Sequence, residues 1–190
     1  MTQTLPQNAT LVVIDVQRGF DAPSWPPRST PAAEANVARL LEAWRRSGRP
    51  VIHVQHDSRE PESVFRPGQP GNAIKSEAAP QPGEAVVHKN VNSAFIGTDL
   101  EERLKAAGCA VVVLVGLTTN HCVSTTARMA GNLGFTTYVA SDATAAFETR
   151  SAAGRLIPAD VMHEVGLAEL DGEFASVVDS ETLIRMATGR

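Results

Sequence analysis

The sequence predicts one three-layer α/β domain in which helices cover both faces of a parallel sheet. Short apolar runs rich in β-branched residues alternate with helix-like stretches along the 190 residues, as is typical of a parallel sheet buried on both faces. The chain is 43% hydrophobic and 20% charged, and its length suits one hydrophobic core. No repeat or linker divides it, so we expect a single domain over residues 1–190.

The first half of the chain supplies three expected strands and one helix. Residues 11–16 are an apolar, β-branched run, which favours a buried strand. Residues 31–47 are expected to be helical, because four apolar side chains recur at helical spacing before Gly48. Residues 50–55 and residues 85–88 repeat the apolar pattern and are the second and third expected strands.

The second half continues this alternation. Residues 99–107 have two leucines one helical turn apart, and residues 110–115, almost purely valine and leucine, are the expected central strand. Residues 122–133 are the next expected helix, which a glycine ends, and residues 135–140 are the fifth strand. The remaining elements are expected to be a mainly helical stretch at residues 151–170 despite Pro158, a short strand at residues 176–178 and a C-terminal helix.

Residues 57–83 interrupt the alternation. They are rich in proline, glycine and charge and have no hydrophobic periodicity. A loop of that length inside a compact domain is usually functional or disordered. Two roles stay open for it at this point, a lid over the site and a contact with a neighbouring subunit.

Composition and charge favour a small-molecule partner. The net charge is −4, and basic and acidic residues are mixed without a basic stripe, so we expect no nucleic acid partner. The N-terminal residues have no secretory pattern, and the longest apolar run, residues 110–115, is far too short to cross a bilayer. We expect a cytoplasmic protein without a membrane partner, in which Cys109 and Cys122 are reduced thiols.

Three residues of catalytic type lie at or beyond the carboxyl ends of expected strands: Asp15 in the first, Lys89 just after the third and Cys122 beyond the fourth. Ligands of open parallel sheets bind beyond the carboxyl ends of the strands, which is where Asp15, Lys89 and Cys122 are expected. Asp15 interrupts an apolar run, and a buried carboxylate needs a cation or hydrogen bonds. Taken singly, Asp15 is explained as well by a role in capping a loop as by catalysis, and Lys89 is better explained as a solvated lysine. A buried aspartate needs a partner, however, and this need favours an ion pair between the two.

Cys122 has the strongest local argument for chemistry. The segment before it joins a buried strand to a helix, so the thiol is expected at a helix N-terminus, where the dipole and free N–H groups favour a thiolate and lower the thiol pKa. The same N–H groups can hold an oxyanion. Cys109 is interpreted as a small core residue, and His121 is not an obvious base for Cys122 because adjacent helical residues diverge.

A metal site is the weaker interpretation of the histidines near the second strand. His53 and His56 point to opposite faces of a strand, so with Asp57 they would chelate a metal poorly. We expect no metal and interpret His56 as a pocket or loop residue.

Three segments occur in a recognisable order. They are Val-Val-Ile-Asp-Val-Gln at residues 12–17, His-Lys-Asn-Val-Asn-Ser-Ala-Phe at residues 88–95 and Gly-Leu-Thr-Thr-Asn-His-Cys-Val at residues 116–123. Together they resemble the isochorismatase-like cysteine hydrolases, a superfamily that includes nicotinamidases, N-carbamoylsarcosine amidohydrolase, maleamate amidohydrolase and isochorismatases. The resemblance extends from about residue 11 to residue 147 and is specific to the superfamily, not to a substrate.

The resemblance implies that Asp15, Lys89 and Cys122 are a catalytic triad. It also implies a cis peptide between Leu117 and Thr118, and an oxyanion hole formed by the N–H groups of Thr118 and Cys122. The implied fold is a Rossmann-like domain with a six-stranded parallel sheet and helices on both faces, usually in homo-oligomers.

Departures from the family's branches narrow the chemistry. Nicotinamidases carry a metal with an Asp-x-His pair after the second strand, whereas residues 53–57 here are His-Val-Gln-His-Asp. Isochorismatases proper cleave a vinyl ether and generally lack a nucleophile at the position of Cys122. Both departures favour a hydrolase without cofactors that cleaves a C–N bond of a small amide-type substrate through a thioester, with Asp15 as acid and base and Lys89 as electrostatic support.

Two alternatives stay open. One is a vinyl-ether hydrolase of the isochorismatase type that uses Asp15 as acid. The other is a catalytically inactive binding protein on the same scaffold, because fold does not dictate function. For either enzyme, the residues expected to line the substrate pocket are Phe20, Trp25, His56, Asn92, Phe95 and His121.

Overall fold

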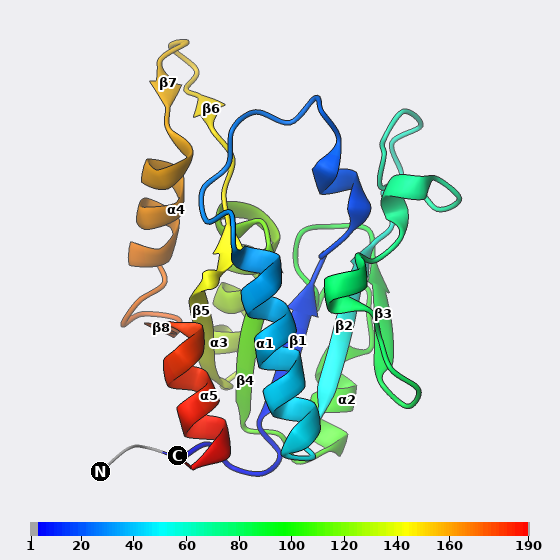
Figure 1. Ribbon diagram of the computed structural model, residues 1–190, viewed down its shortest axis with the longest axis vertical. Coiled ribbons are helices and arrows are strands. Elements are labelled where there is room, and N and C mark those ends of the chain that lie inside the picture. The colour runs from blue at the N-terminus through cyan, green and yellow to red at the C-terminus, as the bar shows by residue number, and fades with distance from the viewer. Residues whose placement is uncertain (1–3, 190) are drawn as a thin grey trace.

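A six-stranded parallel sheet forms the centre of the protein, which a computed structural model describes over residues 4–189 (Figure 1). The strand order is β3-β2-β1-β4-β5-β8, and every neighbouring pair is parallel. The strands are β1 (Thr10–Ile14), β2 (Val51–His56), β3 (Ala85–Lys89), β4 (Val111–Leu117), β5 (Thr136–Ala145) and β8 (Ser176–Val178). The predicted three-layer α/β domain is confirmed.

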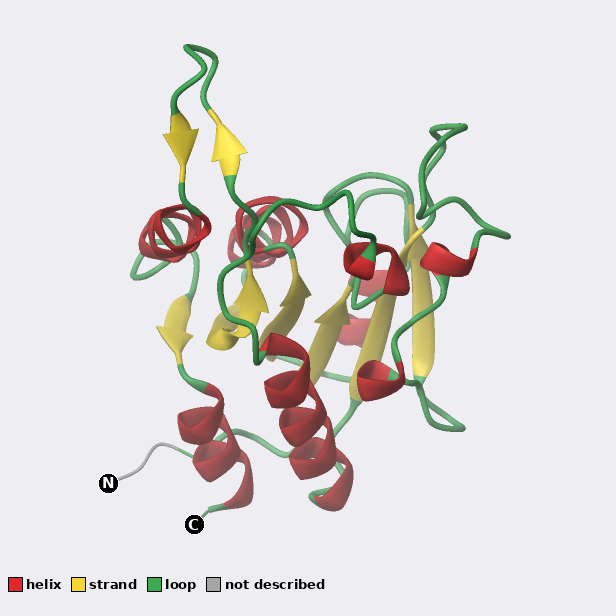
Figure 2. Ribbon diagram, turned by 45° about the horizontal axis from the view of Figure 1, so that its top comes forward, coloured by secondary structure: helices red, strands yellow, loops and turns green. Residues whose placement is uncertain are grey.

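Helices cover both faces of the sheet (Figure 2). One face carries α1 (Ala33–Arg46) and α5 (Ser180–Thr188), and the other carries α2 (Leu100–Ala106), α3 (Ser124–Asn132) and α4 (Ala159–Ala168). None of the helices in the described part of the chain is both long and apolar enough to cross a membrane.

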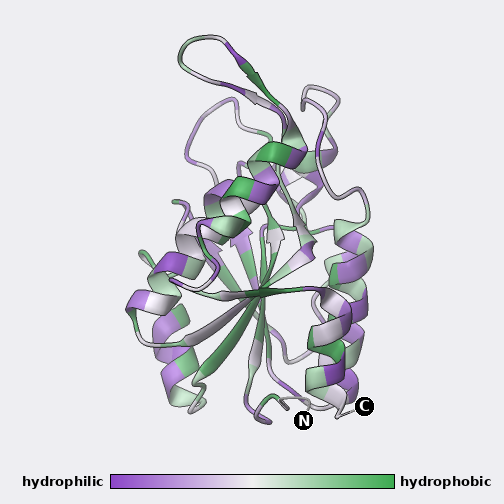
Figure 3. Cartoon of the chain, turned by 90° about the vertical axis from the view of Figure 1, so that its left-hand side faces the viewer, coloured by the Kyte–Doolittle hydropathy of each residue, from purple (hydrophilic) through white to green (hydrophobic). Residues whose placement is uncertain are grey.

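The two hydrophobic cores follow from the two-residue period of β1. Leu11 and Val13 pack with α1 and α5, whereas Val12 and Ile14 pack with α2 and α3. In Figure 3 the strands are mostly apolar and the polar colours gather on the outer faces of the helices. Both faces of β1 are buried, and its polar residue Thr10 lies at one end while Asp15 follows the other end, which positions the site.

Residues 151–170 differ from the prediction of a mainly helical stretch. Residues 149–157 form a protruding antiparallel hairpin, β6 (Thr149–Arg150) and β7 (Leu156–Ile157), and the helix begins only at Ala159. Gly154 has a φ of +77°, which a glycine adopts readily in a turn, and Pro158 cannot lie inside a helix without removing a hydrogen bond. The proline therefore marks the start of α4.

Two further departures concern the segments beside the site. β5 continues to Ala145, past the predicted end at residue 140, with a register shift against β4 between Leu114 and Gly116. The segment expected to start a regular helix at residue 122 instead contains a π-helical turn, η4 (Thr119–Val123), which precedes α3.

The long loop after β2 contains two short 3-10 turns, η2 (Pro70–Asn72) and η3 (Ser76–Ala78), and a third, η1 (Arg18–Asp21), follows β1.

Candidate active site

The carboxyl ends of three strands bring Asp15, Lys89 and Cys122 together. Asp15 follows β1 directly, Lys89 is the last residue of β3, and Cys122 lies in η4 beyond β4. The Nζ atom of Lys89 lies 2.6 Å from Oδ2 of Asp15 and 3.4 Å from Sγ of Cys122. Lys89 must cross the end of β2 to reach them, because β2 separates β3 from β1 in the sheet.

The ion pair of this cluster is almost completely withdrawn from solvent. Asp15 is 1% exposed and Lys89 is 2% exposed. Nζ of Lys89 also donates to Nδ1 of His56 at 3.1 Å and to the carbonyl oxygen of Val91 at 3.2 Å. A buried ammonium needs such acceptors, because losing water without replacement is costly.

The carboxylate of Asp15 is only partly satisfied. Oδ1 of Asp15 is buried and accepts no hydrogen bond from the described residues. The backbone of Asp15 has a φ of 52°, a left-handed conformation that is uncommon for residues other than glycine and that often marks functional sites. The N–H of Asp15 donates to the carbonyl oxygen of Val54 at 2.9 Å, which fixes this conformation against β2.

The position of His56 depends on Gln17. The side chain of Gln17 accepts from the N–H of His56 at 2.9 Å and donates to the carbonyl oxygens of His56 at 3.0 Å and Asn72 at 2.7 Å. Burial, followed by the neighbouring Lys89 ammonium, lowers the pKa of His56. His56 is therefore held as a neutral acceptor for the lysine.

Burial and the neighbouring Asp15 carboxylate raise the pKa of the Cys122 thiol to about 12, against the opposing effect of Lys89. This direction contradicts the prediction that the helix N-terminus would lower the thiol pKa. Burial also raises the pKa of Asp15, although Lys89 opposes the rise. The resting site accordingly keeps the proton on sulfur beside a carboxylate that can accept it, and the protonation of Asp15 and that of Cys122 are coupled.

The turn that carries Cys122 is fixed at Thr118. The peptide bond between Leu117 and Thr118 is cis. The carbonyl oxygen of Thr118 accepts from the N–H groups of His121 and Val123, both at 3.2 Å. Oγ1 of Thr118 lies 3.2 Å from Nδ1 of His121, so the histidine ring contacts the turn and not the thiol.

A cavity of about 350 Å³ opens above the thiol and the carboxylate. Of the pocket residues that the sequence predicts, five line it: Phe20, Trp25, His56, Asn92 and His121. Phe95 does not belong with them, because it packs in the core with its ring stacked on Phe135 at 6.0 Å. Lining residues that sequence reasoning missed are Gln17, Pro26, Phe65, Asn120, Phe147, Glu148 and Thr149.

Four aromatic rings form one wall of the cavity, which we call the aromatic wall: Phe20, Trp25, Phe65 and Phe147. Ring centroids are 4.6 Å apart for Phe20 and Phe65 and also for Trp25 and Phe147, and 5.3 Å apart for Phe20 and Trp25. The rings come from three separate segments, after β1, after β2 and after β5. Aromatic pairs at such separations stabilise one another beyond simple burial.

Close backbone contact joins two of these segments. A Cβ atom on Gly19 would lie 2.6 Å from the ring of Phe65, and one on Gly71 would lie 2.5 Å from the carbonyl oxygen of Val64 and 3.0 Å from Cα of Gly19. Neither position has room for a larger side chain. Both glycines therefore allow Phe65 to reach the cavity.

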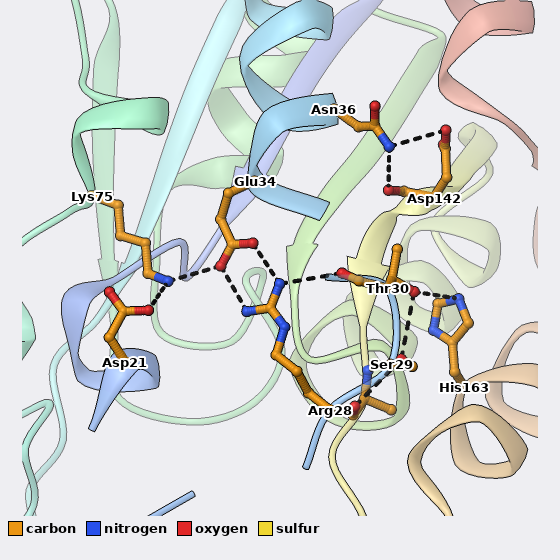
Figure 4. A network of polar contacts seen from close by, with 10 residues as sticks. Asp21, Arg28, Ser29, Thr30, Glu34, Asn36, Lys75, Asp142 and His163 are labelled. Carbon is orange, nitrogen blue, oxygen red and sulfur yellow. Dashed lines mark hydrogen bonds and ion pairs between the residues drawn. The ribbon is translucent and has the colours of Figure 1, made fainter. Parts of the chain in front are cut away.

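A polar network anchors the segment that carries Phe20 and Trp25 (Figure 4). Glu34, in the first turn of α1, receives Arg28 at 2.8 Å and 2.5 Å and Lys75 at 2.8 Å, and Lys75 also binds Asp21 at 2.5 Å. Burial by itself would raise the pKa of Glu34, but the hydrogen bonds from Arg28 and Lys75 outweigh it and lower that pKa to about 2. The network thus connects the loop after β1, α1 and the loop after β2.

Metal ligands do not gather in the described residues. Within residues 4–189 no group of three or more His, Cys, Asp or Glu side chains could hold a metal ion. His53 is buried on the other face of β2, where its Nε2 lies 2.8 Å from Glu84, and His88 lies 3.0 Å from Asp57. The expectation of a site without metal stays a prediction.

Comparisons with known proteins agree with this fold. Residues 9–182 match the family model described as the isochorismatase domain. The isochorismatase family protein YrdC of Bacillus subtilis is 46% identical over 95% of this chain and 96% of its own length, and Nicotinamidase 3 of Arabidopsis thaliana is 32% identical over 95% and 89%. A crystal structure of an isochorismatase-family protein from Chromobacterium violaceum superposes with a TM-score of 0.95 at 45% identity, covering 99% of this chain and 97% of that one.

Proposed function

The chain belongs to the isochorismatase family of hydrolases, and from this premise we propose that it is a cysteine hydrolase that cleaves the C–N bond of a small amide-type substrate. The observation that carries the proposal is the contact of Lys89 with both Asp15 and Cys122 at the floor of an open cavity. A thiol, a carboxylate and a buried ammonium in contact are the groups that covalent acyl transfer needs. The relative named as a nicotinamidase supports an amide as the bond type.

In the acylation step, Asp15 accepts the proton of the Cys122 thiol as Sγ attacks the substrate carbonyl. A C–S bond forms, and the carbonyl electron pair moves to oxygen. The N–H groups of Thr118 and Cys122, both at the cavity, donate to this oxyanion. A donor of this kind typically contributes about 10²–10³ in rate. When the oxyanion collapses, the C–N bond breaks and the leaving amine takes the proton from Asp15.

In the deacylation step, a water molecule attacks the thioester. Asp15 accepts a proton from this water, a second oxyanion forms, and its collapse breaks the C–S bond. The carboxylic acid leaves and the proton returns to the thiolate of Cys122. Lys89 stays charged throughout and stabilises whichever partner, Asp15 or Cys122, is ionised.

The raised thiol pKa fits this sequence of proton transfers. A thiol with a pKa of about 12 is a poor nucleophile in the free enzyme. Its proton must therefore move to Asp15 during attack, when the oxyanion hole stabilises the product of that attack. The resting thiol therefore reacts slowly with electrophiles that cannot use the oxyanion hole.

The test is ammonia release from a panel of small amides, ureas and carbamoyl compounds. We expect turnover by the native chain and none by Cys122→Ala, with Cys109→Ala as the matched control because Cys109 is the buried second thiol. Mass spectrometry after acid quench should find the acyl group on the peptide that contains Cys122. Full activity of Cys122→Ala would remove the thiol from the mechanism, and cleavage of isochorismate without any amide turnover would favour a vinyl-ether hydrolase.

A further inference from the structure

The charges around the cavity are unbalanced. Among the described residues that line it, none is a lysine or an arginine, whereas two, Asp15 and Glu148, carry carboxyl groups. Asp15 is paired with Lys89 beneath the cavity. Glu148 is half-buried and takes part in none of the ion pairs within residues 4–189. The carboxylate of Glu148 thus has no ion-pair partner among the described residues.

Glu148 lies beside the aromatic wall. It follows Phe147 in the chain, and the Phe147 ring stacks on Trp25 with centroids 4.6 Å apart. The N–H of Glu148 donates to the carbonyl oxygen of Pro27 at 2.8 Å, which ties its backbone to the segment that carries Trp25. Aromatic rings and a carboxylate that line one cavity form the kind of surface that attracts an organic cation.

We propose that the cavity selects substrates that carry a positive charge on the part remote from the scissile carbonyl, with Glu148 and the aromatic wall as the binding surface for that charge. That the ligand is a substrate rests on the proposed function, whereas the preference for a cation rests only on the residues that line the cavity. An anionic group would meet Glu148 with no lysine or arginine on the lining to pair with, and an unpaired charge in a partly dry site is costly. The proposal therefore excludes carboxylated amides as good substrates.

The charge preference can be measured at Cys122 without any amide. Three methanethiosulfonates that differ in charge serve as probes: the 2-trimethylammonioethyl, the neutral isosteric 3,3-dimethylbutyl and the 2-sulfonatoethyl reagent. In each reaction the Cys122 thiolate forms a disulfide and methanesulfinate leaves. Rates come from mass spectrometry of the Cys122 peptide, divided by the rates with N-acetylcysteine. The thiolate fraction of one protein is the same for all three probes, so it cancels in their ratios.

We expect the normalised rates to fall in the order cation, neutral, anion, with about tenfold between the first two and about a hundredfold between the first and last. Glu148→Lys should reduce the cation-to-anion ratio at least tenfold, and Glu148→Gln should reduce it less. Glu173→Lys is the matched control, because it makes the same charge change at an exposed residue outside the cavity lining and should leave the ratio unchanged.

Three outcomes overturn the proposal. These are ratios equal to those of the free thiol, a Glu148→Lys ratio equal to that of the native chain, and failure of every probe to reach Cys122. The amide panel separates this result from the proposed function: 4-(trimethylammonio)benzamide should exceed 4-tert-butylbenzamide about tenfold in kcat/KM, and the reverse order contradicts the proposal. If no amide is hydrolysed while the probe ratios hold, the hydrolase proposal fails and the cation preference stands.

Discussion

Asp15, which is buried, and Glu34, which is half-buried, are carboxylates that each contact a lysine in the region after β1, and their surroundings move their pKa values in opposite directions. Glu34 receives three hydrogen bonds from Arg28 and Lys75, which outweigh burial and lower its pKa to about 2. Asp15 has one cation, Lys89, and its Oδ1 has no hydrogen-bond donor among the described residues, so burial prevails and raises its pKa.

The comparison shows that the number of hydrogen-bond donors, not the presence of a lysine, accounts for the opposite directions of the two pKa shifts. Every donor to Glu34 favours its ionised form and makes it a poor proton acceptor. Asp15 keeps an oxygen available and a raised pKa, which suits a group that must take a proton from a thiol and return it. The predictions below test this distinction with matched substitutions.

The largest expected effect is on turnover. Asp15→Asn should lower kcat by about 10³ or more, because the amide cannot accept the thiol proton. Glu34→Gln makes the same chemical change in the structural network and should retain most of the kcat when it is assayed well below its melting temperature. Ammonia release measures both, and similar losses in the two variants would contradict the distinction between the two carboxylates.

The next effect concerns the pKa and the alkylation rate of the Cys122 thiol. The Asp15 carboxylate contributes to the raised pKa of Cys122 and Lys89 opposes the rise. We therefore expect Asp15→Asn to lower the thiol pKa and speed alkylation by iodoacetamide at pH 8 about tenfold, although turnover is lost, whereas Lys89→Met should raise the pKa and slow alkylation. Rates at the Cys122 peptide across a pH series give the pKa directly; a slower reaction in Asp15→Asn would show that the carboxylate does not hold the thiol proton.

Glu34→Gln should affect stability instead. We expect a loss of about 2 kcal/mol in the free energy of unfolding at neutral pH, since the variant leaves Arg28 and Lys75 without their shared anion. The folded pKa of about 2 is below the ordinary 4.5 of a glutamate, so the stabilisation is complete above pH 4.5 and is lost as the pH falls through 2. Urea titrations at several pH values should show the two proteins converging in acid, and a constant difference would mean that Glu34 ionisation is not responsible.

The smallest effect is expected at His56, an acceptor for Lys89. His56→Leu removes that acceptor and should lower kcat about fivefold to tenfold without changing the cavity entrance, whereas His56→Asn can offer an amide oxygen to the ammonium and should recover most of the loss. The pH profile of kcat should shift in His56→Leu and not in His56→Asn. Equal activity of the two variants would assign His56 to packing only.

The cluster of Asp15, Lys89 and Cys122 could be predicted from the sequence because it depends on strand ends. Apolar runs identify the strands, and parallel strands place their carboxyl ends at one edge, so the predicted positions of Asp15, Lys89 and Cys122 follow from local patterns. Their contact across β2 needs the strand order, which the structure shows. The expected homo-oligomer and the lid or subunit-contact role of residues 57–83 stay predictions.

Other features could not be predicted because they depend on tertiary packing. The direction of the Cys122 pKa is set by burial and by Asp15, and neither is visible in the local helix pattern. Phe65 comes from a segment without periodicity, so the sequence could offer a lid role for that loop but not the place of Phe65 in the aromatic wall. Phe95 is the opposite case. Its position shortly after Lys89 in the chain led to the prediction that it lines the pocket, but its side chain packs in the core against Phe135.

The close contact between Gly19 and Gly71 affects the shape of the cavity and not the groups that are proposed to react. A single methyl group at Gly19 would collide with the Phe65 ring and displace it, and one at Gly71 would push apart the two backbones that bring that ring to the cavity. Either change reshapes the space offered to a ligand without replacing the aspartate, the lysine or the thiol. Proteins with this fold can thus differ in the ligands that they bind through substitutions at these two loop positions, neither of which contacts the reacting atoms.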